Sequence, residues 1–151
     1  MKTKIASLSL ALTMFTGAPA LAQETPIDVN KNSGCGCCLG WMDHLADAGF
    51  SPTGEDLSAN ALMDLKLENG VPEDMVSCHT ALIDGYVIEG HVPAADIRRL
   101  LSERPDAIGL AVPGMPYGSP GMGPESDRQA YDVFVINKDG STAVFTNYPA
   151  S

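Results

Sequence analysis

The chain has 151 residues, of which 19 are acidic and nine are Lys or Arg, and its formal net charge is −10 at neutral pH. An acidic chain without a basic cluster is repelled by nucleic acid and by anionic membranes, which argues against both as partners. The length is sufficient for one domain built around one hydrophobic core.

The first 22 residues have the features of a cleavable secretory signal. Lys2 and Lys4 provide a positive start, an apolar run over residues 5–15 follows, and Ala20-Leu21-Ala22 is a small-residue cleavage site. The apolar run is too short to span a bilayer. We therefore expect residues 1–22 to be removed and residues 23–151 to form a single domain in the periplasm, with no insertion into the membrane.

The first half of this domain predicts two strand–helix units. Residues 27–29 alternate as a strand does, and helical spacing begins at Cys38 and ends at Gly49. A second strand is expected over residues 50–56, at a sheet edge because Pro52 has no backbone N–H to donate. A second helix over residues 59–69 would be capped by Ser58.

The second half predicts two hairpins. Residues 81–83 and 86–88 are apolar runs joined by Asp84-Gly85, a strong hairpin signal. A helix opening at Pro93 and stopped by Pro105 follows. Residues 112–127 are rich in Pro, Gly and Met without any period, which predicts a loop or lid. The last hairpin pairs residues 132–136 with residues 143–145.

The order β–α–β–α–β–β–α, with cysteines between the first strand and the first helix, predicts an α/β protein of thioredoxin-like fold. Such a fold has a central mixed sheet flanked by helices, and here a C-terminal β-hairpin is added. The Asp84-Gly85 turn between apolar strands resembles that of glutaredoxin-like chains. In this arrangement His79 lies where related folds hold a cis-proline facing the active cysteines. Cys78 and His79 are therefore expected near the N-terminal cysteines.

The four cysteines are the most specific feature of the sequence. Three lie within the tetrapeptide Cys35-Gly36-Cys37-Cys38, and the fourth is Cys78. Cys35 and Cys38 form a CxxC pair. A helix starting at about Cys37 would direct free N–H groups and its positive dipole end at the sulfurs, which favours the thiolate that attacks disulfides and binds metals.

Two structural roles are alternatives for these cysteines. Two disulfides suit an oxidising compartment, and avoiding the adjacent pair leaves 35–38 with 37–78, or 35–37 with 38–78. A domain of this size and apolar content does not need such staples. Structural zinc is less favoured than copper, because its usual signature has two CxxC motifs whereas here Cys78, with His79, would complete the site alone.

Copper(I) suits the cysteine pattern better. It is a soft ion that accepts two or three thiolate, thioether or imidazole ligands, and thiolates bridge several such ions. The predicted site therefore holds copper, with room for several ions. The candidate ligands are Cys35, Cys37, Cys38, Cys78 and His79, followed by His91, Met115 and Met122.

The remaining candidates have structural interpretations. His44 lies on the first predicted helix, two turns from the cysteines, and is expected to be exposed or to cap a backbone group. Met115 and Met122 lie in the Pro-Gly-rich segment and could equally anchor it to the core. Met42, Met63 and Met75 are predicted core residues. Glu89 and Asp96 are predicted to be solvated, and the acidic residues form no paired-carboxylate motif.

Together these motifs resemble a known periplasmic family, the small copper-resistance proteins of the CopG type, otherwise filed as a metal-binding domain of unknown function. The resemblance covers most of residues 27–145. It implies a thioredoxin-like fold, periplasmic residence and copper handling, with metal on Cys35, Cys37, Cys38 and Cys78 and with His79 as the first imidazole ligand. The motifs that carry it are Cys35-Gly36-Cys37-Cys38 with Trp41 and His44-Leu45, Gly49-Phe50, Gly70-Val71-Pro72, Ser77-Cys78-His79-Thr80-Ala81, the run from Gly85 to Pro93 and the run from Gly109 to Pro116.

The sequence is compatible with two functions. The first is a periplasmic copper-binding protein that holds Cu(I), contributes to copper resistance, exchanges metal with other periplasmic copper-handling proteins and could cycle Cu(I) and Cu(II). The second is a thiol–disulfide oxidoreductase in which Cys35 attacks and Cys38 resolves. The extra thiols of Cys37 and Cys78 are unnecessary for disulfide exchange, and His79 replaces the expected cis-proline. Both observations favour metal binding.

Overall fold

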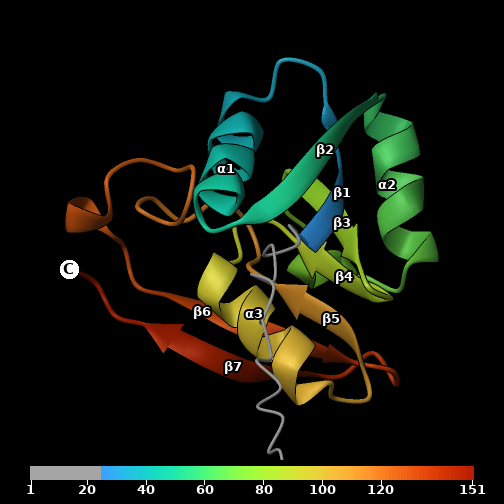
Figure 1. The fold of residues 1–151 in the computed structure, drawn as a ribbon. Helices are drawn as coiled ribbons and strands as arrows, with labels where there is room; N and C mark the ends of the chain where they lie inside the picture. Colours follow the sequence, from blue (N-terminus) through green and yellow to red (C-terminus); the bar gives the residue numbers. More distant parts are fainter. Residues whose placement is uncertain (1–24) are drawn as a thin grey trace, which may run out of the picture.

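A computed structural model of the chain describes residues 25–151, and the predicted signal sequence lies outside this range. Its seven strands form one mixed sheet in the order β2-β1-β3-β4-β5-β6-β7, accompanied by three α-helices (Figure 1). The predicted mixed α/β class is thus confirmed. Among the described residues, none of the helices has the length and apolar character needed to cross a bilayer.

The first strand–helix–strand unit places the cysteine tetrapeptide at one end of the sheet. Strand β1 (Thr25–Asn32) leads into helix α1 (Gly36–Asp47), and β2 (Phe50–Leu57) returns parallel to β1. Gly49 ends the helical segment with φ of +82°, a conformation that glycine adopts without strain. Strand β2 is an edge strand, as Pro52 predicted.

The second unit brings the next strand antiparallel to β1. Helix α2 (Ala59–Glu68) is capped by Ser58, whose hydroxyl accepts from the Ala61 N–H at 3.3 Å. A 3₁₀ turn (Glu73–Met75) then leads into β3 (His79–Ile83). Strand β3 pairs with β1 on one side and with β4 (Tyr86–Glu89) on the other, through the predicted Asp84-Gly85 turn. The sequence predicted these elements to within two residues, apart from the longer β1 and the 3₁₀ turn.

The sheet continues beyond the predicted hairpin through a strand that the sequence analysis missed. After α3 (Ala94–Glu103), strand β5 (Ala107–Ala111) runs parallel to β4. Strand β5 also pairs antiparallel with β6 (Tyr131–Asn137). Strand β6 in turn pairs with β7 (Thr142–Tyr148) to form the expected C-terminal hairpin. A Cβ atom at Gly109 would lie 1.7 Å from the Val87 carbonyl oxygen, so glycine is needed where β5 meets β4. The loop before β6 contains a short 3₁₀ turn (Glu125–Asp127).

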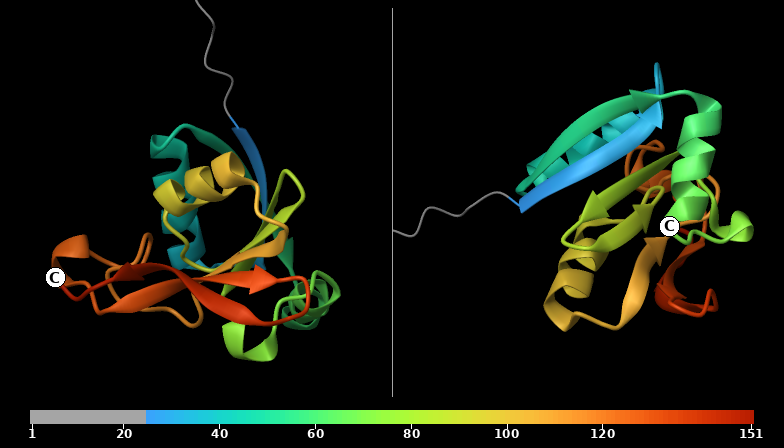
Figure 2. Two further views of the ribbon diagram at one scale, coloured as in Figure 1. Left: turned by 90° about the horizontal axis from the view of Figure 1, so that it is seen from below. Right: turned by 90° about the vertical axis from the view of Figure 1, so that its right-hand side faces the viewer.

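Helices cover both faces of the sheet: α1 and α3 lie on one face and α2 on the other (Figure 2). The larger core lies under α1 and α3 and includes the fully buried Trp41, whose indole N–H donates to the Val92 carbonyl at 2.8 Å. A smaller cluster lies on the opposite side, formed by Val71, Met75, Val87, Ala111 and Ile136. The larger core therefore packs against α1, the helix whose first turn contains the cysteines.

Several predictions about individual side chains were wrong. Asp96 is only 4 % exposed, because its carboxylate accepts from the Thr146 hydroxyl at 2.5 Å and from the Tyr148 hydroxyl at 2.7 Å. Met63 is 41 % exposed on α2 rather than in the core. Met75 is buried, and Met42 packs partly buried against the larger core, as predicted.

Candidate metal centre

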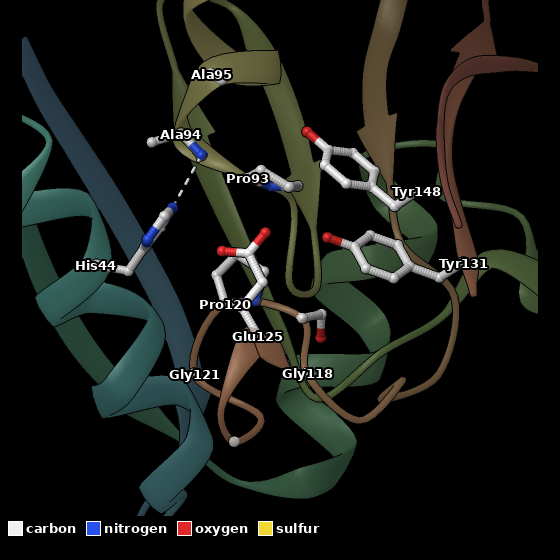
Figure 3. Close-up of a pocket in the computed structure, with 12 residues that line it drawn as sticks. His44, Pro93, Ala94, Ala95, Gly118, Pro120, Gly121, Glu125, Tyr131 and Tyr148 are labelled. Atoms are coloured by element: carbon white, nitrogen blue, oxygen red, sulfur yellow. Dashed lines mark hydrogen bonds between the residues drawn. The ribbon is translucent and has the colours of Figure 1, made fainter. Parts of the chain in front are cut away.

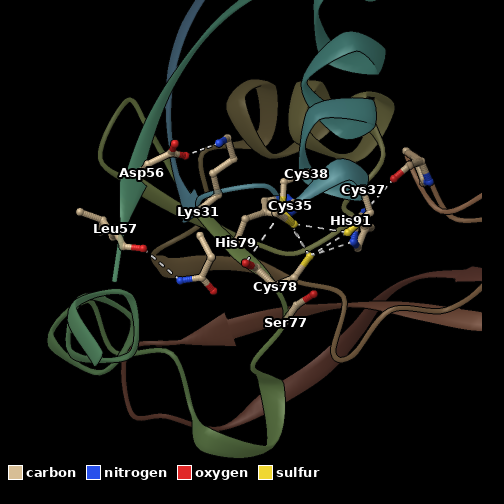
Figure 4. Close-up of a disulfide and its surroundings, with 12 residues drawn as sticks. Lys31, Cys35, Cys37, Cys38, Asp56, Leu57, Ser77, Cys78, His79 and His91 are labelled. Atoms are coloured by element: carbon tan, nitrogen blue, oxygen red, sulfur yellow. Dashed lines mark hydrogen bonds and ion pairs between the residues drawn. A yellow bond between two sulfur atoms is a disulfide. The ribbon is translucent and has the colours of Figure 1, made fainter. Parts of the chain in front are cut away.

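The cysteine tetrapeptide lies at the N-terminal end of α1 (Figure 4). Cys35 is the N-cap residue, with extended backbone, and the helix begins at Gly36. Cys37 and Cys38 therefore occupy the first turn, where backbone N–H groups lack helical partners and the helix dipole is positive.

Strand pairing brings the fourth cysteine to the same place. His79 is opposite Lys31 in the β1–β3 register, so Cys78 reaches the end of β1 from which α1 departs. The Cys78 Sγ lies 3.6 Å from the Cys38 Sγ and 3.7 Å from the Cys37 Sγ, across about 40 residues of chain. All four sulfurs fall within 4.8 Å of one another.

The four sulfurs are in two oxidation states. Cys35 and Cys38 form a disulfide, whereas Cys37 and Cys78 are free and partly exposed. The Cys35 Sγ is 3.5 Å from the Cys37 Sγ. Of the pairings considered from the sequence, the structure has only the disulfide between Cys35 and Cys38. The cysteines therefore do not form the two disulfides expected of a purely structural role.

Two histidines complete the cluster from the side of Cys78. The Nδ1 of His79 lies 3.3 Å from the Cys78 Sγ, and the Nε2 of His91 lies 3.1 Å from it. The other ring nitrogen of His91, Nδ1, donates to the Pro120 carbonyl at 2.8 Å. Since a carbonyl only accepts, this contact places the proton of neutral His91 on Nδ1 and leaves a bare lone pair on Nε2 facing the sulfur.

His79 is fully buried among aromatic rings. Its ring centroid lies 4.4 Å from that of Trp41 and 5.0 Å from that of His91, in an edge-on contact. Its Nε2 has no hydrogen-bond partner among residues 25–151. A buried ring nitrogen without a partner is costly and uncommon in folded proteins. The cost marks this histidine as a functional candidate.

The other predicted site residues are not part of the cluster of sulfurs and imidazoles. His44 accepts from the Ala94 N–H at 3.1 Å and so caps α3, which is one of the two roles expected for it. Met115 is 55 % exposed, and Met122 is half-buried. The segment between them approaches α1 closely: a Cβ atom at Gly121 would lie 2.5 Å from the Cys37 carbonyl oxygen. This segment is therefore a cover over the first turn of α1.

A buried ion pair supports the Cys78 segment from beneath. The Lys66 ammonium donates to the Glu89 carboxylate and to the Thr80 hydroxyl, both at 2.7 Å. Glu89 also accepts from the Ser77 N–H at 2.6 Å, so it holds the backbone next to Cys78. The prediction that Glu89 is solvated was wrong, since its exposure is 0 %. A signal existed in the sequence: Lys66 lies on the apolar stripe of its helix.

Burial and neighbouring charges control the protonation of the cluster. Burial and the adjacent Cys37 raise the pKa of Cys78 to about 12. Burial, His91 and the positive charge of Lys66 lower the pKa of His79 to about 3. Burial also lowers the pKa of His91. Both imidazoles are therefore neutral at neutral pH, which is the state that binds metal ions.

We expect the metal-free protein to lose stability as the pH falls from 7 to 5. The pKa values of His44, His79 and His91 are all lowered by burial in the folded state. Because the unfolded chain binds these protons first, stability is present above about pH 6.5 and is lost as the pH falls toward the folded pKa values. His79 alone accounts for about 2 kcal/mol between pH 7 and 5. Urea unfolding across this range measures the loss. His79→Gln should flatten the profile, and an unchanged slope would contradict the assignment.

A pocket of about 400 Å³ lies beside the covering segment (Figure 3). His44, Pro120, Gly121 and Glu125 line it, together with the stacked rings of Tyr131 and Tyr148, whose centroids are 4.8 Å apart. Pro120 thus contacts both sites. Its carbonyl accepts a hydrogen bond from His91, and its ring lines the pocket.

These observations define a mixed α/β protein with a sulfur- and imidazole-rich cluster suited to a soft metal ion. The family model described as a protein of unknown function, DUF411, matches residues 75–122. Two solved structures of copper resistance protein CopG are similar over the whole of their own length. Form 2 has 46 % sequence identity, covers 84 % of this chain and superimposes with a TM-score of 0.77. Form 1 has 44 % identity, covers 85 % and has a TM-score of 0.78.

The chain belongs to the CopG family of copper-resistance proteins. A search of curated proteins returned no match. The range matched by the family model contains Cys78, His79, His91 and the covering segment, whereas the tetrapeptide Cys35–Cys38 precedes it.

Proposed function

We propose that the protein is a periplasmic copper-binding protein that holds Cu(I) on Cys35, Cys37, Cys38 and Cys78, assisted by His79 and His91, and thereby contributes to copper resistance. The observation that carries the proposal is the cluster of four sulfurs, with two neutral imidazoles in contact with one of them, Cys78. This donor set is soft, and Cu(I) is among the ions that such donors favour. The names of the solved relatives agree with this metal.

The number of donors supports more than one copper ion. Cu(I) is satisfied by two or three ligands, and one thiolate can bridge two ions. Once the Cys35–Cys38 disulfide is reduced, the cluster offers six donors from four cysteines and two histidines. A structural zinc ion would use four ligands and leave two unused. The surplus favours several Cu(I) ions over one zinc ion. Met115 and Met122 are further candidate ligands on the covering segment.

The sheet order supports a thioredoxin-like fold as part of the same proposal. The four strands β2-β1-β3-β4, with β1 parallel to β2 and antiparallel to β3, form the half of the sheet next to the cluster. The CxxC pair at the start of α1 is then in the redox position of such folds. We further infer that redox chemistry is coupled to copper. Oxidising two thiolates to the Cys35–Cys38 disulfide releases two electrons, which reduce two Cu(II) ions to Cu(I).

A thiol–disulfide oxidoreductase remains the second candidate, because the disulfide closes the CxxC pair at a helix N-terminus. Two observations weigh against it. Cys37 lies 3.5 Å from Cys35, and Cys78 lies 3.6 Å from Cys38, so both can attack the disulfide within the chain. An enzyme that exchanges disulfides with other proteins gains nothing from such internal competition.

An anaerobic Cu(I) titration of the exported protein tests the proposal. The reduced protein, with four thiols counted, should bind more than one copper per chain against a competing chelator. The disulfide form, with two thiols, should bind fewer and more weakly. Equal binding by both forms would contradict the coupling of the disulfide to copper. Binding no tighter than that of a scrambled peptide, together with rapid insulin reduction, would favour the oxidoreductase.

A further inference from the structure

The pocket beside the covering segment differs in chemical character from the sulfur cluster. Its volume of about 400 Å³ lies in the range of pockets that hold small ligands, and none of its lining residues is a cysteine. Alanines and prolines from the start of α3 and from the covering segment form the apolar part of its wall. The stacked rings of Tyr131 and Tyr148, together with Glu125, add hydroxyl and carboxylate oxygens.

The two tyrosines present hydroxyl oxygens to this pocket. Their hydroxyl ends point toward the side on which Pro93 and the Glu125 carboxylate lie (Figure 3). The Tyr148 hydroxyl donates its proton to the buried Asp96 carboxylate at 2.7 Å, so only its lone pairs are left for a ligand. The Tyr131 hydroxyl has no hydrogen-bond partner among residues 25–151. Both oxygens are therefore available as acceptors.

Glu125 adds an acceptor with a negative charge. Its Oε1 accepts from the Arg128 guanidinium at 2.5 Å, whereas Oε2 has no partner in the described part of the chain. The Arg128 guanidinium also donates to the Pro149 carbonyl at 2.9 Å, so it is held to one side of the carboxylate. One carboxylate oxygen thus remains open to a ligand.

The charges around the pocket are predominantly negative. Burial raises the pKa of Tyr131 to about 12, and the carboxylates of Asp96 and Glu125 act in the same direction, while Arg128 opposes them. Burial lowers the pKa of His44, so its imidazole is neutral at neutral pH and adds no positive charge. The chain as a whole has a formal net charge of −10. A positively charged group is therefore favoured over an anion.

The start of α3, which also lines the pocket, does not reverse this preference. A helix N-terminus attracts anions through its free N–H groups and the positive end of its dipole. Here the His44 Nε2 accepts from the Ala94 N–H at 3.1 Å, and Asp96 lies in the first turn of the helix. One free N–H group and the dipole are thus already compensated within the chain.

We propose that this pocket binds a primary ammonium group carried on a short aliphatic chain, with Glu125, Tyr131 and Tyr148 as its acceptors. An ammonium group has three N–H donors and no acceptor, which matches one carboxylate oxygen and two hydroxyl oxygens. The apolar part of the wall contacts the methylene groups, as it does for buried lysine stems. A free aliphatic amine and a lysine side chain of another protein share this chemistry. The site uses none of the sulfurs and goes beyond the proposed copper function.

An NMR titration of the isotope-labelled, metal-free disulfide form tests the proposal in phosphate buffer, which contains no amine. The diamine cadaverine should cause saturable shifts at Ala95, Gly121 and Tyr131, which line the pocket. The uncharged n-pentanol and the anion n-pentanoate should bind at least about tenfold more weakly, because each lacks the charged donor. A short uncharged peptide with one central lysine is the second probe. Binding of cadaverine supports a free amine as the ligand, and binding of the peptide alone supports a lysine of a partner protein.

Two substitutions in the pocket and one control complete the test. Tyr131→Phe should weaken cadaverine binding by about threefold to tenfold, since it removes one hydrogen bond. Glu125→Gln should weaken it by at least about threefold, a modest loss because this carboxylate is largely exposed. Glu73→Gln removes the same charge from an exposed site on the 3₁₀ turn (Glu73–Met75), and it should leave the affinity unchanged.

Several results would overturn the proposal. These are the absence of saturable shifts with both amines, n-pentanol binding as tightly as cadaverine, or equal weakening by Glu73→Gln and Glu125→Gln. If Tyr131→Phe does not fold, Glu125→Gln, a surface substitution of nearly the same shape, decides the result. The test uses no copper, so its outcome is separate from that of the Cu(I) titration.

Discussion

Replacing Cys78 with serine should lower the Cu(I) affinity of the reduced protein by at least about 100-fold, which is the upper end of the loss seen when only a supporting contact of a metal ligand is removed. Cys78 has the largest number of donor contacts in the cluster. Its sulfur lies within 3.7 Å of two cysteine sulfurs and within 3.3 Å of two imidazole nitrogens. A serine hydroxyl is a hard donor that cannot bridge Cu(I) ions.

Cys37→Ser is the matched control for this prediction. Cys37 also has a free thiol, but among the donors it contacts only Cys35 and Cys78. We expect its replacement to reduce the number of bound copper ions with a smaller loss of affinity. Competition titrations with a Cu(I) chelator compare the two variants. A loss for Cys37→Ser equal to or greater than that for Cys78→Ser would show that Cys78 is not the central ligand.

The sequence predicted most of the fold because local signals marked its turns. Asp84-Gly85 specified the β3–β4 hairpin, and Asp84 indeed has a positive φ of 48° there. Strand β5 was missed for the opposite reason. It is a five-residue run, Ala107–Ala111, directly after a helix and before an irregular segment, and its length and composition do not distinguish it from a loop. Its pairing with β4 is a long-range contact that no local pattern records.

The sequence predicted which cysteines lie close together, but not which of them form a disulfide. The spacing at Cys35–Cys38 and the expected position of Cys78 were enough to place the four sulfurs together. The choice of the 35–38 disulfide over the alternative pairings depends on side-chain directions in the first turn of α1. The contact of His91 with Cys78 depends on the Pro120 carbonyl, which comes from a segment about 30 residues away.

Buried charges were the main failure of the sequence analysis. Glu89 follows three apolar residues in β4 and Asp96 lies in the first turn of α3, where acidic residues are often solvated. Each is buried because a partner on another element satisfies it: Lys66 for Glu89, and Tyr148 with Thr146 for Asp96. Composition and periodicity consider each acidic residue by itself, whereas its burial depends on a partner from another part of the chain.

The Lys66–Glu89 pair should therefore give the largest stability effects in the chain. Removing one partner of a buried ion pair costs about 3–5 kcal/mol, because the other charge is left buried without compensation. Glu89→Gln leaves the Lys66 ammonium 3 % exposed and without its counter-ion. Domains of this size have unfolding free energies of about 5–15 kcal/mol. This single substitution can therefore remove a large part of the unfolding free energy. Urea unfolding of the metal-free protein measures the loss.

Lys66→Met and the double variant decide whether the effect belongs to the pair. Burial already raises the pKa of Glu89, so Glu89 should take up a proton when Lys66 is removed. The cost of Lys66→Met should then shrink between pH 7.5 and pH 5.5, while that of Glu89→Gln should not. The double variant Lys66→Met/Glu89→Gln should be more stable than Glu89→Gln alone, giving a coupling energy of at least about 1 kcal/mol. Additive losses would mean that the two residues act independently.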